Sequence, residues 1–370
     1  MSGAPDRPER HPAAAYTIAP PVAPRPIVVI GAGGIVRDAH LPAYRKAGFP
    51  VWGIVDRARP RADALAAEYG IEHVFEDVAS AVAAAPSDAV YDIAIMPEQF
   101  PAVLAALPDG AGALIQKPLG RTLAEGVALR DLCRRKGLAA AVNTQLRFAP
   151  YVAEARRLIA AGAIGDVYDM AIRVRVDTPW HLFPVVGLER LEITMHSVHY
   201  LDLVRSFFGD PDAVSAVTLP HPLKPEIAST RSTILLRYRD RPLRVTIDTD
   251  HDHAFGPGHE ESSIMWQGTE GALRAQMGLL LDYPTGGADA LEIVRLDEKE
   301  LGWRDVPFEG TWFPDAFIGS MGAVQRFLDG SVPDLPIAVE DVLHTMAVVE
   351  AAYTSQDVEG VPVRIPEMSE

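Results

Sequence analysis

The stretch that decides the fold is PIVVIGAGGIV, residues 26–36. The apolar run from Ile27 to Ile30 predicts a buried strand, and the glycines behind it predict a tight turn into a helix. Gly31 suits such a turn, and Gly33 lets the backbone approach a pyrophosphate group. Free N–H groups at the start of the helix would stabilise that anion. The stretch therefore predicts the first strand, turn and helix of a dinucleotide-binding unit.

The same alternation of strand and helix continues to about residue 147. Further short apolar strands are predicted at 51–56, 72–75, 90–96, 112–118 and 138–145, with helical stretches between them. Strands and helices that alternate in this way form right-handed βαβ units and a parallel, doubly wound sheet. We therefore expect an NAD(P)-binding Rossmann domain over residues 26–147.

Beyond residue 148 the pattern changes to long alternating strands, at 229–240, 241–250, 261–278 and 290–296. Such strands indicate a large, open and mainly antiparallel sheet with one covered face. Residues 148–370 are therefore predicted to form an α+β domain for substrate binding and oligomerisation. Residues 1–25, rich in Pro and Ala, are predicted to form a flexible N-terminal arm.

Composition excludes several functional classes. The 370 residues carry 50 acidic against 34 basic side chains, a formal net charge of -16, which disfavours a nucleic-acid partner. No run of about 18 apolar residues is present, so we expect no membrane span. A single cysteine, Cys133, excludes an intrachain disulfide and agrees with a reducing, cytoplasmic location.

Two positions extend the cofactor prediction. Asp56 ends the second strand, where a carboxylate accepts hydrogen bonds from ribose hydroxyls, and this favours NAD. Arg57 follows it and suits a 2′-phosphate, which leaves NADP open. Lys117 follows the fifth strand, where ligands bind in such sheets, and it is predicted to hold a substrate hydroxyl.

The segment EITMHSVHYLDLVRSFFG, residues 192–209, brings Glu192, His196, His199 and Asp202 to one helical face. Histidine has an ordinary pKa of about 6.5, which suits a general base. Buried core histidines and a metal site are the alternative interpretations. The segment DTDHDHAFGPGHE, residues 248–260, also resembles a metal site by composition; its His251 and His253 reach the mouth of a pocket or lie on the sheet surface.

The segments GAGGIVRDAHLPAY (31–44), IMPEQF (95–100), QKP (116–118) and NTQLRFAP (143–150) together resemble the Gfo/Idh/MocA family of oxidoreductases. The resemblance covers nearly the whole chain after residue 25. A closer likeness, to bacterial sugar dehydrogenases of the D-apiose dehydrogenase type, rests on TPWHLFP (178–184), MHSVHYLDLVRSFFGDP (195–211), TRSTILLRY (230–238) and WFPDAFIGSM (312–321). The family resemblance implies a homodimer or homotetramer and a tightly held nicotinamide cofactor. It also implies that a sugar, polyol or inositol-like substrate is oxidised without a metal.

The resemblance also implies roles for single residues. His199 matches the catalytic histidine of the family, and Lys117 matches its lysine. Met195 stands where the family has an aspartate, so Glu192 or His196 is expected to supply the missing polar group. Gln116 replaces the family's glutamate, and Met96 its threonine.

The complete set of predicted contacts follows from both lines of reasoning. The catalytic residues are Lys117, His199, His196 and Glu192. Cofactor contacts are predicted at Gly31, Gly33, Gly34, Ile35, Asp56, Arg57, Met96, Pro97, Gln116, Lys117, Asn143 and Gln145. Substrate contacts are predicted at Lys117, Arg147, Asp177, Trp180, His181, His196 and His199.

The predicted function is an NAD(P)-dependent dehydrogenase that transfers hydride from an alcohol to nicotinamide. Two alternatives stay open. One is an NAD-dependent glycosidase that acts through transient oxidation, and the other is a non-catalytic sensor of nucleotide or sugar.

Overall fold

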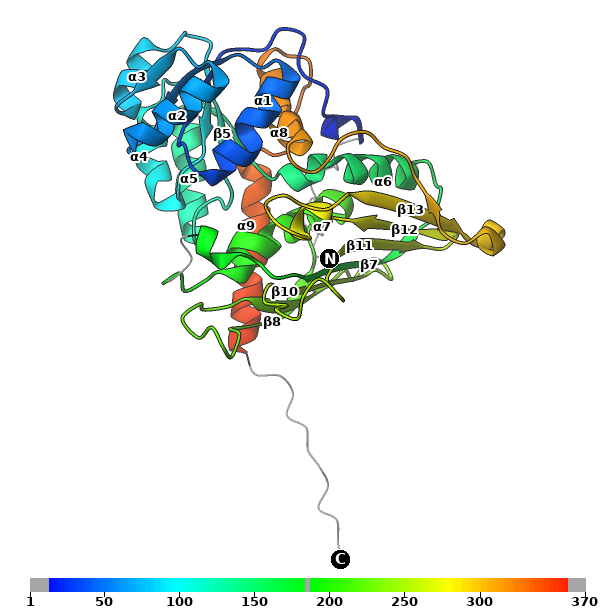
Figure 1. Cartoon of the computed structure of the whole chain (residues 1–370). Coiled ribbons are helices and arrows are strands. Elements are labelled where there is room, and N and C mark those ends of the chain that lie inside the picture. The colour runs from blue at the N-terminus through cyan, green and yellow to red at the C-terminus, as the bar shows by residue number, and fades with distance from the viewer. Residues whose placement is uncertain (1–12, 184–186, 359–370) are drawn as a thin grey trace, which may run out of the picture.

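A computed structural model describes residues 13–183 and 187–358, which form two sheets with helices around them (Figure 1). The predicted arm therefore lies partly outside the described residues. The first sheet has six parallel strands in the order β3-β2-β1-β4-β5-β6. Its strands are β1 Ile27–Ile30, β2 Val51–Val55, β3 His73–Phe75, β4 Val90–Ile93, β5 Gly112–Ile115 and β6 Ala139–Val142. This confirms the predicted Rossmann sheet.

Strand β1 lies at the centre of this sheet, between β2 and β4, and all four of its side chains are buried. Gly31 follows with a φ of 113°, and a Cβ atom there would stand 2.3 Å from the Ala94 carbonyl oxygen. The turn therefore requires glycine. The chain then enters a π-helical turn, Val36–His40, which continues directly into α1, Leu41–Ala47.

The remaining helices of this half flank the parallel strands. They are α2 Arg59–Tyr69, α3 Val78–Ala84, α4 Phe100–Ala106 and α5 Leu123–Arg135. Short 3-10 helices lie at Ala13–Tyr16, Pro97–Gln99 and Gln145–Phe148. Asp77 and Thr122 begin α3 and α5, and the side chain of each accepts a hydrogen bond from a backbone N–H of the first turn.

The second sheet has eight strands in the order β14-β13-β12-β11-β7-β10-β9-β8. The bounds are β7 Val167–Arg175, β8 Ala213–Leu219, β9 Arg231–Arg237, β10 Arg244–Asp250, β11 Glu261–Gly268, β12 Gly271–Gln276, β13 Ala290–Arg295 and β14 Arg304–Asp305. Strands β7 and β10 pair in parallel and the other neighbours are antiparallel. The predicted α+β half is confirmed as a mixed, mainly antiparallel sheet.

Helices cover one face of this second sheet. Helix α6, Pro150–Ala160, and helix α7, Val198–Phe208, lie on the same side (Figure 1). Side chains along β9 alternate between buried and solvent-facing, as expected for a sheet with one covered face. The homodimer or homotetramer stays a prediction.

Two C-terminal helices join the halves. Helix α8, Asp315–Leu328, packs on α1 and β5 of the first sheet, although it follows the second sheet in the chain. Helix α9, Val339–Asp357, packs on α5 and β6 and also on α7 and β8 (Figure 1). Helices from the end of the chain therefore pack on the first sheet.

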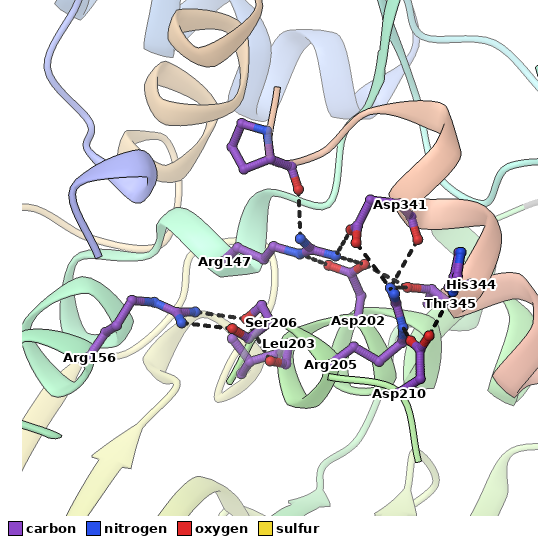
Figure 2. A network of polar contacts seen from close by, with 11 residues as sticks. Arg147, Arg156, Asp202, Leu203, Arg205, Ser206, Asp210, Asp341, His344 and Thr345 are labelled. Atoms are coloured by element: carbon purple, nitrogen blue, oxygen red, sulfur yellow. Dashed lines mark hydrogen bonds and ion pairs between the residues drawn. The ribbon is translucent and has the colours of Figure 1, made fainter. Parts of the chain in front are cut away.

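A buried ionic network fixes α7 against α9 (Figure 2). The Arg147 guanidinium donates to both carboxylate oxygens of Asp202, at 2.5 and 2.6 Å, and to Asp341 at 2.6 Å. It also donates to the Pro336 carbonyl oxygen at 2.8 Å. Arg147 and Asp202 are each 1% exposed. Burial opposes ionisation of Asp341, but Arg147 and Arg205 keep the pKa of its carboxyl below the usual value.

This network corrects one sequence-based prediction. Arg147 was expected to contact substrate, but its guanidinium is committed to two carboxylates and a carbonyl oxygen in the protein interior. A buried guanidinium has to be paired and hydrogen-bonded, and these partners provide that compensation. Arg147 is therefore a structural residue in this chain.

None of the helices formed by the described residues is both long and apolar enough to cross a membrane.

The network predicts a large difference between two ion pairs. Arg147→Met leaves the Asp202 carboxylate buried without its cation, so we expect a loss of about 3–5 kcal/mol in the free energy of unfolding. His344→Asn removes a half-exposed pair with Asp210 and should cost no more than about 1 kcal/mol. Urea unfolding measures both. Equal losses for the two variants would contradict the structural role of Arg147.

Candidate active site

The Lys117 side chain connects the two halves of the molecule. It follows β5, and its Nζ donates to the Met195 carbonyl oxygen at 2.7 Å. Burial lowers the pKa of this amine to about 8, because the surroundings of low polarity disfavour the charged form. The lysine therefore changes its charge close to neutral pH, which suits a group that binds or exchanges a proton.

Met195 lies in a π-helical turn, Ile193–Ser197, that leads directly into α7. The expected single helix over 192–209 thus begins with a wider turn, a feature frequent at functional sites. The position where the resemblance implies an aspartate presents a backbone carbonyl to the lysine in this chain.

His196 and His199 lie one turn apart at this junction, and both are half-buried. Burial, the charges of His251 and Lys117, and the neighbouring His199 hold the pKa of His196 well below 6.5. Burial and the Lys117 charge do the same for the pKa of His199. Nδ1 of His199 is buried and has no hydrogen-bond partner among the described residues. Both imidazoles are therefore neutral at pH 7.

Glu192 lies behind the histidines and is fully buried. Its Oε1 accepts a hydrogen bond from the Ser197 hydroxyl at 2.8 Å and lies 3.4 Å from Nε2 of His251. His251, just after β10, stacks on His196 with ring centroids 4.4 Å apart. His251 is missing from the predicted catalytic set. The histidine-rich segment 248–260 was the only signal for it, and the composition of that segment suggested metal instead.

Trp180, Asp177 and His181, the predicted substrate contacts next to the first strand of the second sheet, lie together. They line a cavity of about 430 Å³ with Thr178, Pro179, Lys224, Glu226 and Ile227. The Trp180 ring meets the rings of His196 and His251 edge-on, at 5.6 and 5.9 Å. Its Nε1 donates to Asp252, which also pairs with Lys224. This cavity therefore adjoins the histidine cluster through the tryptophan.

The predicted cofactor residues lie at the carboxyl ends of the parallel strands. A Cβ atom added to Gly33 would meet nothing within 4 Å, so the space beside the turn is open. The Asp56 carboxylate accepts from the backbone N–H groups of Ala32 and Ala58, each at 2.7 Å. Carboxylate oxygens accept more than one hydrogen bond, so Asp56 keeps capacity for ribose hydroxyls. Arg57, next to it, is exposed.

A buried polar network supports Gln116 and Asn143. Nδ1 of His40 lies 2.7 Å from the Asp92 carboxylate, which also accepts from the Tyr44 hydroxyl at 2.8 Å. Nε2 of His40 then faces the side-chain amides of Gln116 and Asn143, at 3.3 and 3.4 Å. If Asp92 accepts the Nδ1 proton, Nε2 accepts from both amides, and this fixes their orientation. Asp92 and Tyr44 were not anticipated from the sequence.

The arrangement fits a dinucleotide at several points. The side-chain oxygen of Gln116 accepts a hydrogen bond from the backbone N–H of Lys117. The side-chain oxygens of Asn143 and Gln145 are buried and have no hydrogen-bond partner among the described residues. Pro97 is buried and begins the short helix after β4, next to Met96. Gly34 and Ile35 lie in the first turn of the helix behind the glycine turn. These groups and the open space beside Gly33 suit a polar ligand along the strand ends.

The described residues hold no cluster of three or more His, Cys, Asp or Glu side chains suited to a metal ion. The segment 248–260 instead contributes His251 to the histidine cluster, and His253 bonds to the Gly258 carbonyl oxygen.

Comparisons with known proteins identify the family of the chain. Residues 25–144 match the model of the oxidoreductase family with an NAD-binding Rossmann fold, and residues 152–274 match the GFO/IDH/MocA C-terminal domain. A D-apiose dehydrogenase of Paraburkholderia graminis is 28% identical over 88% of this chain and 86% of its own.

Solved structures show the same fold. An oxidoreductase of Agrobacterium radiobacter, in complex with NAD+, L-tartaric acid and magnesium, superposes with a TM-score of 0.75 at 22% identity, over 90% of this chain and 97% of its own. A levoglucosan dehydrogenase in complex with NADH and levoglucosan superposes with a TM-score of 0.73 at 20% identity, over 90% of this chain and 98% of its own. The chain belongs to the Gfo/Idh/MocA family of NAD(P)-dependent oxidoreductases.

Proposed function

We propose that this enzyme oxidises a CH–OH group of a sugar or polyol, with His199 as the general base and Lys117 as the group that orients the reacting hydroxyl. The observation that carries the proposal is the buried Lys117 amine, with its pKa near 8, held beside two histidines that are neutral at pH 7. The sugar dehydrogenases similar to this chain support the substrate class.

Alcohol oxidation requires two events at one carbon atom. The hydroxyl loses a proton, and the carbon loses a hydride, which the nicotinamide ring accepts when the cofactor is bound. The Lys117 ammonium donates a hydrogen bond to the hydroxyl oxygen and stabilises the negative charge that develops there. The neutral His199 imidazole takes the proton, a form of help typically worth about 10²–10⁴ in rate.

The substrate approaches from the side of Trp180. Asp177 and His181 are exposed at the rim of the adjoining cavity, where hydroxyl groups find donors and acceptors. A largely apolar body with a few fixed polar groups is the usual composition of a small-ligand site. His196 contacts Trp180, which lines this cavity. It serves as a second polar contact to the substrate.

We propose NAD as the cofactor, because Asp56 places a carboxylate where a 2′-phosphate would be repelled. Arg57 is exposed beside it, so NADP is the alternative for the same fold. The residues proposed to hold either dinucleotide are the predicted set from Gly31 to Gln145.

The assignment of the base predicts a selective loss of turnover. His199→Asn should lower kcat by about 10²-fold or more, because the imidazole proposed to accept the hydroxyl proton is then absent. Binding of NAD should remain close to that of the unchanged enzyme. The measurement is NADH absorbance at 340 nm with a panel of sugars and with both NAD and NADP, alongside calorimetric NAD titration.

The same assay separates the alternatives. Steady NADH formation that falls in His199→Asn supports the proposal. Sugar cleavage without net NADH would point to a glycosidase, and silence in both readouts to a sensor. Unchanged turnover in His199→Asn would refute the base assignment.

The two pKa shifts predict a pH profile. His199 acts in its neutral form, and its pKa lies well below 6.5, so the rate should be flat between about pH 6.5 and 7.5. Lys117 acts in its charged form, so kcat/KM should fall as the pH rises through about 8. Lys117→Met should be slower and should lack this alkaline limb. An alkaline limb that persists in Lys117→Met would contradict the role of the lysine.

A further inference from the structure

His251 is a buried side chain at this site to which the proposed function gives no role. It is 1% exposed and follows the end of β10, and its ring lies against His196 of the helix that carries the other histidines. Both of its ring nitrogens face polar partners. Nδ1 lies 3.0 Å from the Thr178 hydroxyl, and Nε2 lies 3.4 Å from the Glu192 carboxylate.

The group beside Nε2 of His251 is the carboxylate of Glu192, which is fully buried. Ser197 donates to Oε1 of Glu192, while Oε2 has no hydrogen-bond partner among the described residues. A buried carboxylate is costly unless a cation or several donors compensate it. The imidazole of His251 is placed to do so, because its Nε2 lies 3.4 Å from Oε1 of Glu192. The phenols of Tyr200 and Tyr353 also interact with the Glu192 charge. Burial and the Glu192 charge both raise the pKa values of these phenols, which therefore stay neutral.

The His251 ring contacts the His196 ring. The two centroids are 4.4 Å apart at an interplanar angle of 44°, and the Trp180 ring makes a T-shaped contact with each of the two rings. Nδ1 of His251 is hydrogen-bonded to Thr178, whereas Nε2 lies within ion-pair distance of Glu192 but has no hydrogen-bond partner among the described residues. His196 therefore packs against a ring that is itself hydrogen-bonded.

We propose that Glu192 and His251 form a buried carboxylate–imidazole pair that positions His196 and keeps it neutral toward the substrate. This inference rests on the proposed function, in which His196 contacts the substrate. The family pattern has an aspartate on this helix. In this chain the carboxylate of Glu192 acts on His196 through the ring of His251. His251 is a positioning residue, because it reaches the substrate only through His196.

The charges around His196 determine how the pair acts. Lys117 faces it from the end of β5, His199 from α7 and His251 from the end of β10. The Lys224–Asp252 pair lies on the far side of Trp180. Removal of His251 takes away one of the three basic neighbours that disfavour a proton on His196.

The test is a pH titration of His196 by NMR in the full chain loaded with NAD, with selective ¹³C labelling of histidine and assignment by His196→Gln. We expect His196 in the unchanged protein to titrate well below pH 6.5, and His251→Phe to raise its midpoint measurably. His253→Phe, a matched change two residues further along, should leave the midpoint in place. An unshifted midpoint in folded His251→Phe would overturn the proposal, and so would an ordinary midpoint near 6.5 in the unchanged protein.

A second variant guards against misfolding. If His251→Phe does not fold because Glu192 is left unpaired, Glu192→Gln combined with His251→Phe removes the buried charge and should show the same upward shift. Failure of the double variant to shift His196 also overturns the proposal.

Kinetic measurements on the two variants distinguish a failure of this inference from a failure of the proposed function. His251→Phe should mainly raise KM and move the acid limb of kcat/KM upward, whereas His199→Asn lowers kcat. If His199→Asn is inactive and His251→Phe leaves the His196 titration unchanged, only this inference fails. If His199→Asn is fully active, the base assignment fails whatever the titration shows.

Discussion

The contact on which the site depends is the hydrogen bond from Lys117 to the Met195 carbonyl oxygen. It joins the end of a parallel strand to the first turn of the helix that carries the histidines. An ammonium in this position loses much of its hydration, so its affinity for a proton falls, and its remaining charge disfavours protons on both nearby imidazoles. This contact therefore joins the halves at the point where three side chains with lowered pKa values meet, and burial is the main cause of all three shifts.

Met195 is a departure from the family pattern, and the structure gives it a physical meaning. An aspartate here would place a negative charge beside the lysine and raise its proton affinity. The backbone carbonyl that takes its place is a weaker, uncharged acceptor, which leaves the Lys117 amine easier to deprotonate. The chain retains a carboxylate nearby at Glu192, but it is buried and reaches the histidines through His251. Compared with the family pattern, the negative charge is no longer beside Lys117, while the histidines keep a polar neighbour.

Sequence reasoning was strong where the pattern is local. The glycine turn, the parallel, doubly wound sheet and the position of Lys117 at a strand end all follow from short-range periodicity and from known rules of chain connection. It was weaker where distant segments meet. His251 pairs with Glu192 across the sheet, and Arg147 with Asp202 and Asp341 from three separate elements. No spacing in the sequence indicates such contacts. Arg147 was therefore predicted at the substrate, and His251 was missing from the predicted catalytic set.

The most direct test of this account is the protonation of Lys117 itself. Its side-chain resonance can be followed by NMR across pH in the full chain and assigned by its loss in Lys117→Arg. The account predicts a midpoint at about 8, because the amine is desolvated beside a carbonyl and two imidazoles. A midpoint at the ordinary value of 10.5 would mean that the amine is hydrated and free, and it would contradict the proposed site.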